Sequence, residues 1–224
     1  MCIRDRDLAG TIDWPHVLML VSVLTMTVGN VIGLAQRSVK RMLAYSSIAH
    51  GGYLLVAIIA ANDVGKASLL FYLASYAVTN VGAFGIIALL GSRHQGNDEL
   101  RDYAGLAHSH PGLAALMTIF LLSLGGFPPT AGFIAKWYTF SAAVSAGYYG
   151  LAIIGMLSSV VSVYFYLRIV VMMYMSDRDA RPVPPAISRV AMAGLVASVA
   201  AVLWLGVLPA PVIAWAERSI STIF

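Results

Sequence analysis

A lysine lies inside one of the long apolar segments of this 224-residue chain, where a charged side chain is costly to bury. Lys136 comes seven residues after Pro129, which places it about 10 Å along a helix that begins near Thr130. Burial disfavours the charged form of an amine and a nearby carboxylate favours it, so a buried lysine can exchange a proton as its surroundings change. Lys136 is therefore a candidate proton-transfer group. The alternative is that its ammonium reaches the membrane surface beside Trp137 and Tyr138.

A histidine in the second apolar segment is the other candidate for proton transfer. His50 lies nine residues after Arg41, about 13 Å along the helix if the helix starts there. Histidine gains and loses protons near neutral pH, and neighbours such as Ser46 and Tyr53 could hold a chain of water molecules beside it. The same segment also fits a close contact between helices in which His50 is only a hydrogen-bonded filler. Both interpretations stay open on the sequence alone.

Other polar residues in the apolar segments are weaker candidates for a functional role. Tyr76 and Asn80 are expected to pack between helices, and Arg168 is close enough to the end of its segment to reach the membrane surface. Every Asp and Glu falls in a loop or near an end of a segment. A carboxylate that pairs with Lys136 would therefore have to come from elsewhere, either a missing part of the protein or a partner subunit.

The segment that carries Lys136 contains a break. Residues 111–146 are too many for one crossing, and the thirteen apolar residues 112–124 reach only about 20 Å before the sequence Gly-Gly-Phe-Pro-Pro. Non-helical backbone inside a membrane is tolerated only where protein or a water-filled cavity surrounds it, as in the broken helices of transporters. Four residues therefore predict a discontinuous helix: Gly125, Gly126, Pro128 and Pro129. The alternative is a helical hairpin or a proline kink without a transport role.

The composition indicates that helices crossing a membrane position these residues. The chain is 59% hydrophobic and 11% charged, and its mean hydropathy is +0.82. Open sheets cannot satisfy their backbone in lipid, and the alternating pattern of a membrane barrel is absent from the sequence. We therefore predict an all-α fold, a polytopic membrane helix bundle with about six transmembrane segments, one of them discontinuous, at residues 14–35, 42–61, 66–90, 111–146, 148–175 and 187–208.

Positive charge predicts which side of the membrane is cytoplasmic. Lys and Arg gather in the connections that follow the first, third and fifth segments, and these connections lie on one side. The net charge of +4 thus reflects topology rather than affinity for nucleic acid, because the basic residues form no continuous stripe. The lone cysteine, Cys2, offers neither a disulfide framework nor a metal-ligand pattern. Residues 1–13 are too polar to span, which indicates a fragment or foreign residues at the start of the chain.

Two stretches of the sequence resemble a known family. Residues 30–53 read NVIGLAQRSVKRMLAYSSIAHGGY, and residues 122–138 read LSLGGFPPTAGFIAKWY. In this order they look like motifs of the antiporter-like, proton-pumping membrane subunits of respiratory complex I. The resemblance covers nearly the whole chain from Trp14 and corresponds to the C-terminal half of a typical member.

The resemblance implies an organisation and a role for each candidate residue. Family members contain two inverted five-helix repeats, each with one discontinuous helix. Residues 14–175 would then be the second repeat, and residues 176–224 a cytoplasmic loop, a closing transmembrane helix and a short tail. In the family, the lysine that matches Lys136 is the terminal proton-transfer group, and His50 matches a polar position in the path that follows.

The function implied by the resemblance is proton translocation in a bacterial inner membrane or an equivalent energy-coupling membrane, driven by quinone reduction in other subunits. No cofactor is expected in this chain, because NADH, flavin, iron–sulfur clusters and quinone would bind elsewhere in complex I. The expected partners are other membrane subunits of complex I, the lipid bilayer and protons, but not nucleic acid. Two alternatives stay open: a subunit of a multisubunit sodium/proton antiporter, which shares the motifs, and a structural membrane scaffold with no ion path.

Overall fold

The described part of the chain is built from helices. The computed structural model describes residues 13–91, 98–176 and 188–223. No strand occurs in these three ranges, which confirms the predicted all-α bundle. The polar segment 1–12 and the basic residues Arg93, Arg178 and Arg181, on which part of the topology prediction depended, lie outside the described residues.

Within those ranges, five helices are long and apolar enough to cross a membrane. They are α1 (Trp14–Ala35), α2 (Val39–Ala60), α3 (Asp63–Leu90), α7 (Tyr149–Met175) and α8 (Arg189–Val207). The fourth predicted segment is a pair of shorter helices, α5 (Pro111–Gly125) and α6 (Ala131–Ser145), and the turn between them contains the Phe-Pro-Pro sequence. The predicted break in this segment is therefore confirmed.

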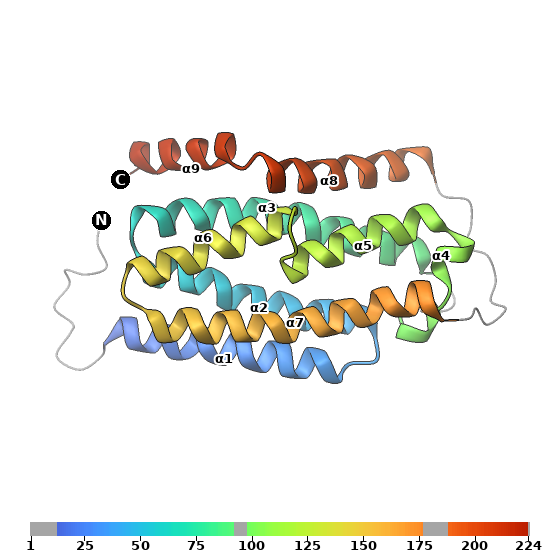
Figure 1. Cartoon of the computed structure of the whole chain (residues 1–224), viewed down its shortest axis with the longest axis horizontal. Helices are drawn as coiled ribbons and strands as arrows, with labels where there is room; N and C mark the ends of the chain where they lie inside the picture. Colours follow the sequence, from blue (N-terminus) through green and yellow to red (C-terminus); the bar gives the residue numbers. More distant parts are fainter. Residues whose placement is uncertain (1–12, 92–97, 177–187, 224) are drawn as a thin grey trace.

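The long helices lie side by side along the long axis of the molecule (Figure 1). At one end of the bundle α1, α3 and α7 end and α2, α5 and α8 begin, and at the other end α2 and α6 end and α3 and α7 begin. Two short helices, η2 (Leu100–Tyr103) and α4 (Leu106–Ser109), belong to the first of these ends. The alternation that the topology prediction requires is thus present in the fold.

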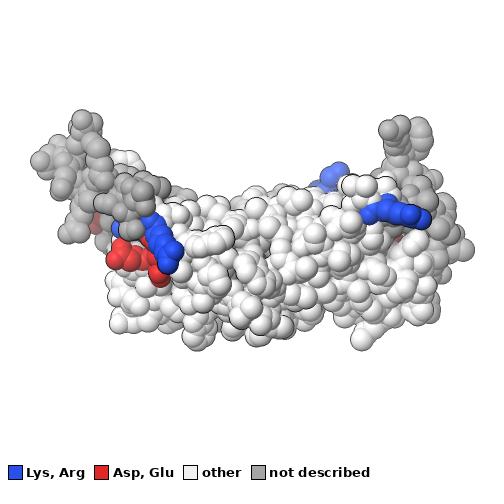
Figure 2. Space-filling view, turned by 90° about the horizontal axis from the view of Figure 1, so that it is seen from above, with Lys and Arg blue, Asp and Glu red and all other residues white. Residues whose placement is uncertain are grey.

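The surface has the character of a membrane-embedded protein. On the face shown in Figure 2, the Lys, Arg, Asp and Glu side chains lie toward the two ends of the long axis, with an uncharged surface between them. Large apolar side chains are exposed along α1 and α7, including Leu20 and Val160, which are 61% and 67% exposed. Apolar side chains exposed over this length require lipid or another protein around them, and the chain is an integral membrane protein.

Polar caps fix where two of the long helices begin. The Ser38 hydroxyl accepts a hydrogen bond from the backbone N–H of Arg41, so α2 starts three residues before the predicted start at residue 42. The Asn62 side chain accepts from the N–H of Gly65 at 2.7 Å and starts α3 three residues early, at Asp63. Both differences arise because hydropathy marks the lipid-crossing residues, whereas caps mark the first helical turn.

Small residues bring α1 and α2 into close contact. A Cβ added to Gly29 would lie 2.9 Å from the backbone nitrogen of Ala49, and a Cβ added to Gly52 would lie 2.9 Å from that of Met26. The Ser22 hydroxyl donates to the Gly52 carbonyl at 2.8 Å across the same contact. Glycine permits this approach of two backbones in a membrane, and the contact fixes the face of α2 that carries His50.

The segment expected as a short tail after the closing helix folds as a helix of 14 residues, α9. After Leu208 and Pro209, α9 (Ala210–Ile223) continues along the line of α8 toward the end of the bundle where α1 begins, and it packs against α3 (Figure 1). Gly206, near the end of α8, contacts the turn between α5 and α6, where an added Cβ would overlap the carbonyl oxygen of Pro129. Helix α8 therefore covers the break.

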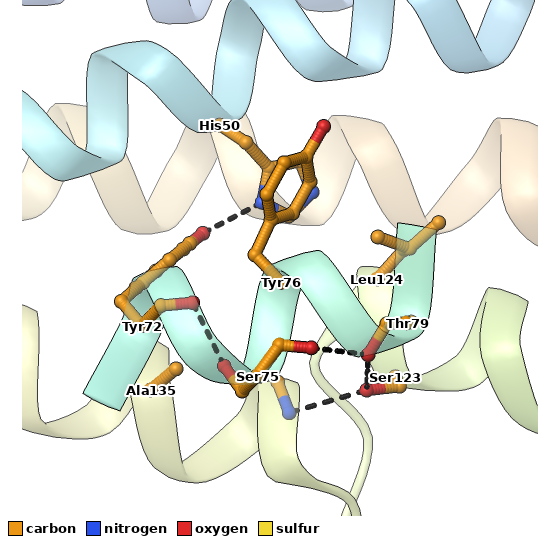
Figure 3. A pocket seen from close by; sticks show the side chains of 9 residues that line it. His50, Tyr72, Ser75, Tyr76, Thr79, Ser123, Leu124 and Ala135 are labelled. Atoms are coloured by element: carbon orange, nitrogen blue, oxygen red, sulfur yellow. Dashed lines mark hydrogen bonds between the residues drawn. The ribbon is translucent and has the colours of Figure 1, made fainter. Parts of the chain in front are cut away.

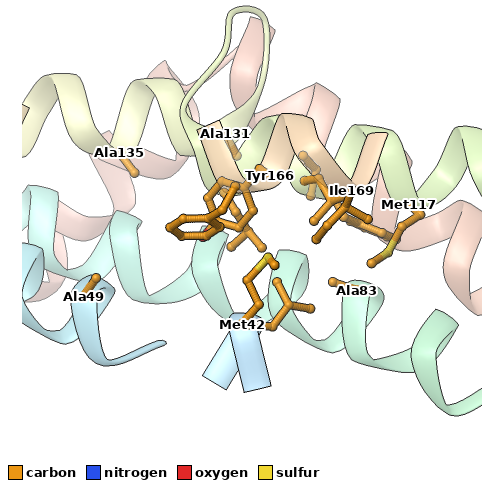
Figure 4. Packing of buried hydrophobic residues seen from close by; sticks show 14 of the residues in the cluster. Met42, Ala49, Ala83, Met117, Ala131, Ala135, Tyr166 and Ile169 are labelled. Atoms are coloured by element: carbon orange, nitrogen blue, oxygen red, sulfur yellow. The ribbon is translucent and has the colours of Figure 1, made fainter. Parts of the chain in front are cut away.

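A buried apolar cluster surrounds the broken pair. Figure 4 shows members of this cluster on α2, α3, α5, α6 and α7, which meet next to the turn between α5 and α6. Several of these members are alanines, including Ala83, Ala131 and Ala135, which leave room for neighbouring helices. The interior is not purely apolar, because His50, Lys136 and several hydroxyl groups are buried in it.

Candidate functional site

The break begins with a helix end that leaves two carbonyl oxygens unused. Gly126 has a φ of +85°, a conformation that glycine adopts without strain. Its N–H donates to the carbonyl of Ser123 at 3.0 Å, and the N–H of Phe127 donates to that of Leu122 at 3.0 Å. This is the Schellman arrangement of helix ends. It satisfies the carbonyls of Leu122 and Ser123 and leaves those of Leu124 and Gly125 for other donors.

Lys136 supplies those donors. Its ammonium nitrogen lies 3.0 Å from the carbonyl oxygen of Leu124, 3.0 Å from that of Gly125, and 2.8 Å from the hydroxyl of Ser159 on α7. The side chain is 6% exposed and points into the bundle rather than to its surface. The C-terminal end of a helix carries partial negative charge, so α5 stabilises the ammonium where the sequence suggested a carboxylate from elsewhere.

An aromatic ring covers a further side of the ammonium. The ring centre of Tyr53 lies 5.3 Å from the Lys136 nitrogen, within the range of a cation–π interaction. Asn30 of α1 fixes this ring, because its side-chain NH₂ donates to the Tyr53 hydroxyl at 3.1 Å and to the Ser158 carbonyl at 2.9 Å. Asn30 is 1% exposed, and it ties α1, α2 and α7 together at the level of the lysine.

His50 lies in a second group of hydrogen-bonded side chains. One ring nitrogen, Nδ1, is 2.7 Å from the Tyr72 hydroxyl of α3, and the other, Nε2, is 3.4 Å from the Tyr166 hydroxyl of α7. Tyr166 is in turn hydrogen-bonded to Ser46. The imidazole also stacks on the ring of Tyr76, with 4.7 Å between ring centres (Figure 3). His50 is thus connected through hydroxyl groups on both sides.

A small cavity separates the histidine from the break. It has a volume of about 10 Å³, the room for one water molecule, and His50, Tyr76, Leu124 and Gly132 are among its lining residues. Along one wall, Figure 3 shows a chain of polar contacts from α3 to the break. The hydroxyls of Thr79 and Ser123 lie 3.3 Å apart, and Ser123 accepts from the N–H of Gly132 at 3.2 Å. These contacts link α3 to the break beside the cavity that His50 lines.

The remaining candidates from the sequence lie in different places. Ser46 and Tyr76 belong to the histidine group, whereas Asn80 is partly exposed and no hydrogen bond in the described structure joins it to that group. Arg168 donates to the carbonyl of Leu34 at 3.4 Å, near the last turn of α1. Arg168 therefore has a structural contact with α1 from a partly buried position.

The structure adds five residues that the sequence did not single out: Asn30, Tyr72, Ser123, Ser159 and Tyr166. All are polar residues within apolar helices, which was the available signal. This signal was insufficient, because many serines and tyrosines of this chain lie within apolar helices. Only the packing of the helices shows which of these side chains contact one another. Within the described residues, no group of three or more His, Cys, Asp or Glu could hold a metal ion.

Replacing His50 with leucine is expected to destabilise the protein by leaving the buried hydroxyl of Tyr72 without its partner. A buried hydroxyl that loses its hydrogen bond lowers the free energy of unfolding by about 1 to 3 kcal/mol. Thermal unfolding in detergent measures the change. Tyr72→Phe is the matched control, since it removes the hydroxyl itself. The double variant should lose less stability than the sum of the two single variants, and simple additivity would show that the two side chains do not interact.

The chain is similar to known proteins in both sequence and structure. Residues 3–162 match the family described as "NADH:quinone oxidoreductase/Mrp antiporter, TM". The chain is 46% identical over 211 residues to NADH-quinone oxidoreductase subunit N of Trichlorobacter lovleyi, covering 94% of this chain and 43% of that protein. It is 41% identical over 223 residues to the subunit N of Heliobacterium modesticaldum, covering 99% of this chain and 47% of that protein. The chain thus spans less than half the length of these relatives.

Two solved complexes contain chains of the same fold. A chain of respiratory complex I from Thermus thermophilus with bound aureothin superposes with a TM-score of 0.77 at 34% identity, covering 89% of this chain and 45% of that one. A chain of the Mrp complex from Dietzia sp. superposes with a TM-score of 0.82 at 21% identity, covering 91% of this chain and 46% of that one. The second likeness is one of fold alone.

Proposed function

The chain belongs to the NADH:quinone oxidoreductase/Mrp antiporter transmembrane family, and on that premise we propose that it is part of a proton-translocating membrane subunit, subunit N, of NADH-quinone oxidoreductase. Residues 14–175 correspond in this proposal to the second five-helix repeat of the subunit. Residues 176–224 correspond to its cytoplasmic loop, closing helix and tail. Both the matched family and the 46% identity to a subunit N support the assignment.

The observation that carries the proposal is the position of the Lys136 ammonium at the end of a broken helix. Its charge is held by two backbone carbonyls and one hydroxyl, and no carboxylate is among these partners. Such a charge is sensitive to small movements, because a shift of the α5 end changes the stabilisation of the ammonium relative to the neutral amine. A change of electrostatics or conformation elsewhere in the enzyme could therefore make Lys136 release or take up a proton.

His50 and its hydroxyl neighbours are the proposed source of that proton. The imidazole lies between the hydroxyls of Tyr72 and Tyr166, and the water-sized cavity separates it from the helix end that binds Lys136. Imidazole is the side chain best suited to proton relay near neutral pH. We assign His50 and Lys136 as the two proton-transfer groups of this chain, with the break at Gly125, Gly126, Pro128 and Pro129 as the element that places the lysine.

The site favours protons over sodium as the transported ion. A lysine ammonium repels Na⁺, whereas it can release and accept H⁺. The freed carbonyls of Leu124 and Gly125, which are the kind of oxygen ligand that Na⁺ would use, are occupied by this ammonium. The relatives at 41–46% identity are also subunits of NADH-quinone oxidoreductase, whereas the Mrp chain is only 21% identical. A sodium/proton antiporter is accordingly the second candidate.

The redox chemistry is assigned to other subunits. We propose that NADH, flavin, iron–sulfur clusters and quinone bind outside this chain, which contributes to the enzyme as a subunit that moves protons. Its proposed partners are the other membrane subunits of complex I, next to the lipid of a bacterial inner membrane. The exposed apolar faces of α1 and α7 are available for either kind of contact.

Ion flux in sealed vesicles tests the proposed function. The assembled enzyme, containing the full-length subunit, should acidify the vesicle lumen when NADH reduces a quinone, at equal rates with and without sodium salts in the buffer. A protonophore should collapse the pH gradient, and radioactive sodium should not accumulate. Sodium-dependent acidification together with sodium movement would support the antiporter instead, and quinone reduction without any ion flux would support a structural scaffold.

A further inference from the structure

We propose that Asn30 is a positioning residue for Lys136 and acts through Tyr53, an inference that rests on the proton-transfer role proposed above for the lysine. Asn30 lies on α1, and none of the hydrogen bonds of the ammonium goes to it. The hydroxyl of Tyr53 accepts from Asn30 at 3.1 Å, and the ring of the same tyrosine lies 5.3 Å from the ammonium nitrogen. Asn30 therefore holds one end of the side chain whose ring covers the charge.

A backbone carbonyl fixes the orientation of the Asn30 amide. Its NH₂ group donates to the Ser158 carbonyl at 2.9 Å and to the Tyr53 hydroxyl, and two hydrogens suffice for both bonds. If the amide were turned over, its oxygen would face the Ser158 carbonyl oxygen, and two acceptors at this distance repel each other. The hydroxyl oxygen of Tyr53 is therefore the acceptor, and the amide ties the ring of α2 to the backbone of α7.

The bond to Ser158 also sets the ring beside another partner of the lysine. Ser158 and Ser159 share a peptide unit, and the Ser159 hydroxyl accepts from the Lys136 ammonium at 2.8 Å. One amide thus fixes the ring from α2 next to the turn of α7 that binds the same ammonium. The connection lies inside the bundle, because Asn30 and Tyr53 are each 1% exposed and Ser158 is 6% exposed.

The oxygen of the Asn30 amide argues against a role in packing alone. This atom is buried, and it has no hydrogen-bond partner among the residues that the structure describes. An unpaired buried acceptor destabilises a protein, and an apolar side chain of similar size would avoid that loss. What asparagine supplies here is its NH₂ group, whose two bonds go to Tyr53 and Ser158.

A fixed Tyr53 ring has two effects at the site. Its face attracts the Lys136 ammonium through a cation–π interaction, which depends on the ring staying over the charge. The same ring lies 5.7 Å from the imidazole ring of His50, so it stands between the two proposed proton-transfer groups. Without the bond from Asn30, the ring can shift, and the ammonium loses part of its stabilisation.

A double-mutant cycle on thermal unfolding tests this role. Asn30→Leu removes the NH₂ group at similar volume, and Lys136→Met removes the charge but keeps an unbranched side chain. Both variants and their combination are made in the full-length subunit and unfolded in detergent. Asn30→Leu should lower the unfolding midpoint by about 2 °C less in the Lys136→Met protein than in the wild type. Equal losses would overturn the proposal, because a purely structural asparagine contributes the same stability with or without the charge.

Tyr53→Phe provides a second variant for the same cycle. It removes the hydroxyl that accepts from Asn30 and keeps the aromatic ring, so it breaks the same bond from the other side. The difference between the two proteins should again be about 2 °C. If Asn30→Leu does not fold, this variant decides alone, and equal losses in the wild type and the Lys136→Met protein overturn the proposal.

Proton pumping by the assembled enzyme gives the functional result. Asn30→Leu should pump about tenfold more slowly, because small displacements of reacting groups reduce rates by up to about 10²-fold. Asn62→Leu is the matched control. Asn62 also donates to a carbonyl of another helix, that of Ala142 at 3.0 Å, but its hydrogen bonds lie outside the site. This control should lose stability and pump normally, and equally slow pumping by both variants would overturn the proposal.

Parallel measurements on Lys136→Ala separate this inference from the proposed function. If Lys136→Ala stops pumping while Asn30→Leu pumps as fast as the wild type, the positioning role of Asn30 is wrong and the proposed function stands. If Lys136→Ala itself pumps normally, the proposed function is wrong. The unfolding cycle requires no pumping, so it decides in either case whether Asn30 acts on the ammonium.

Discussion

Lys136→Ala should stop proton translocation by the assembled enzyme while leaving the subunit in the membrane. The substitution removes the one charged donor at the break, and the carbonyls of Leu124 and Gly125 can then bind water that enters the space vacated. A positioned proton-transfer group contributes about 10²- to 10⁴-fold to a rate, so the loss of pumping should be nearly complete. Lumen acidification, measured together with quinone reduction in the same vesicles, gives the result.

Two further variants show whether the exchangeable proton or the charge of Lys136 is needed. Lys136→Arg keeps a cation that can bond the same carbonyls, but a guanidinium does not release its proton in proteins, so pumping should stay low. Lys40→Ala is the control for losing a lysine, because Lys40 lies at the end of the bundle, 60% exposed and 3.9 Å from Asp98. Unchanged pumping in Lys136→Ala would leave the scaffold without an ion path as the better explanation.

Gly126→Ala should disrupt the break itself. The φ of +85° at Gly126 is unfavourable for a residue with a side chain, at about 1 to 2 kcal/mol. An added Cβ would also lie 3.0 Å from the Cδ of Lys136, so the lysine side chain would have to shift by a few tenths of an ångström relative to its carbonyl partners. We expect both a lower thermal unfolding midpoint and a large loss of proton pumping, because the variant alters the helix end that stabilises the ammonium.

Gly147→Ala provides a matched control for this prediction. Gly147 has a φ of +83° in the connection between α6 and α7, and an added Cβ there would meet nothing within 4 Å. Gly147→Ala therefore has the same kind of backbone penalty as Gly126→Ala, but its added Cβ does not contact Lys136. Gly147→Ala should lose stability but keep its pumping. If both variants lost pumping equally, general destabilisation rather than the position of Lys136 would explain the effect of Gly126→Ala.

The break between α5 and α6 could be predicted from the local sequence. A glycine pair followed by two prolines cannot continue a helix, and thirteen apolar residues before it cannot cross a membrane, so the discontinuity between α5 and α6 was predictable. The other crossings followed from hydropathy in the same way. The ends of these helices in the structure differ from the predicted ends by up to three residues, as at Val39 and Asp63, because capping hydrogen bonds determine where the first helical turn begins.

The partners of the two proton-transfer candidates depend on tertiary structure. Lys136 meets Ser159 across 23 residues of sequence, and His50 meets Tyr166 across 116. Such contacts depend on the rotation and height of each helix in the bundle, which hydropathy does not specify, because any apolar face is equally acceptable to lipid. Close contacts between helices, such as those at Gly29 and Gly52, fix the rotation and height of each helix in the folded chain.

The sequence by itself thus determined that the chain crosses a membrane, where one helix breaks and that a lysine follows the break. Only the tertiary structure decided what holds that lysine. The sequence contains no carboxylate within its apolar segments, which suggested a partner outside them. The folded chain instead uses the backbone, because a helix that ends inside the bundle leaves carbonyl oxygens at Leu124 and Gly125 that need a donor, and Lys136 is the cation within their reach.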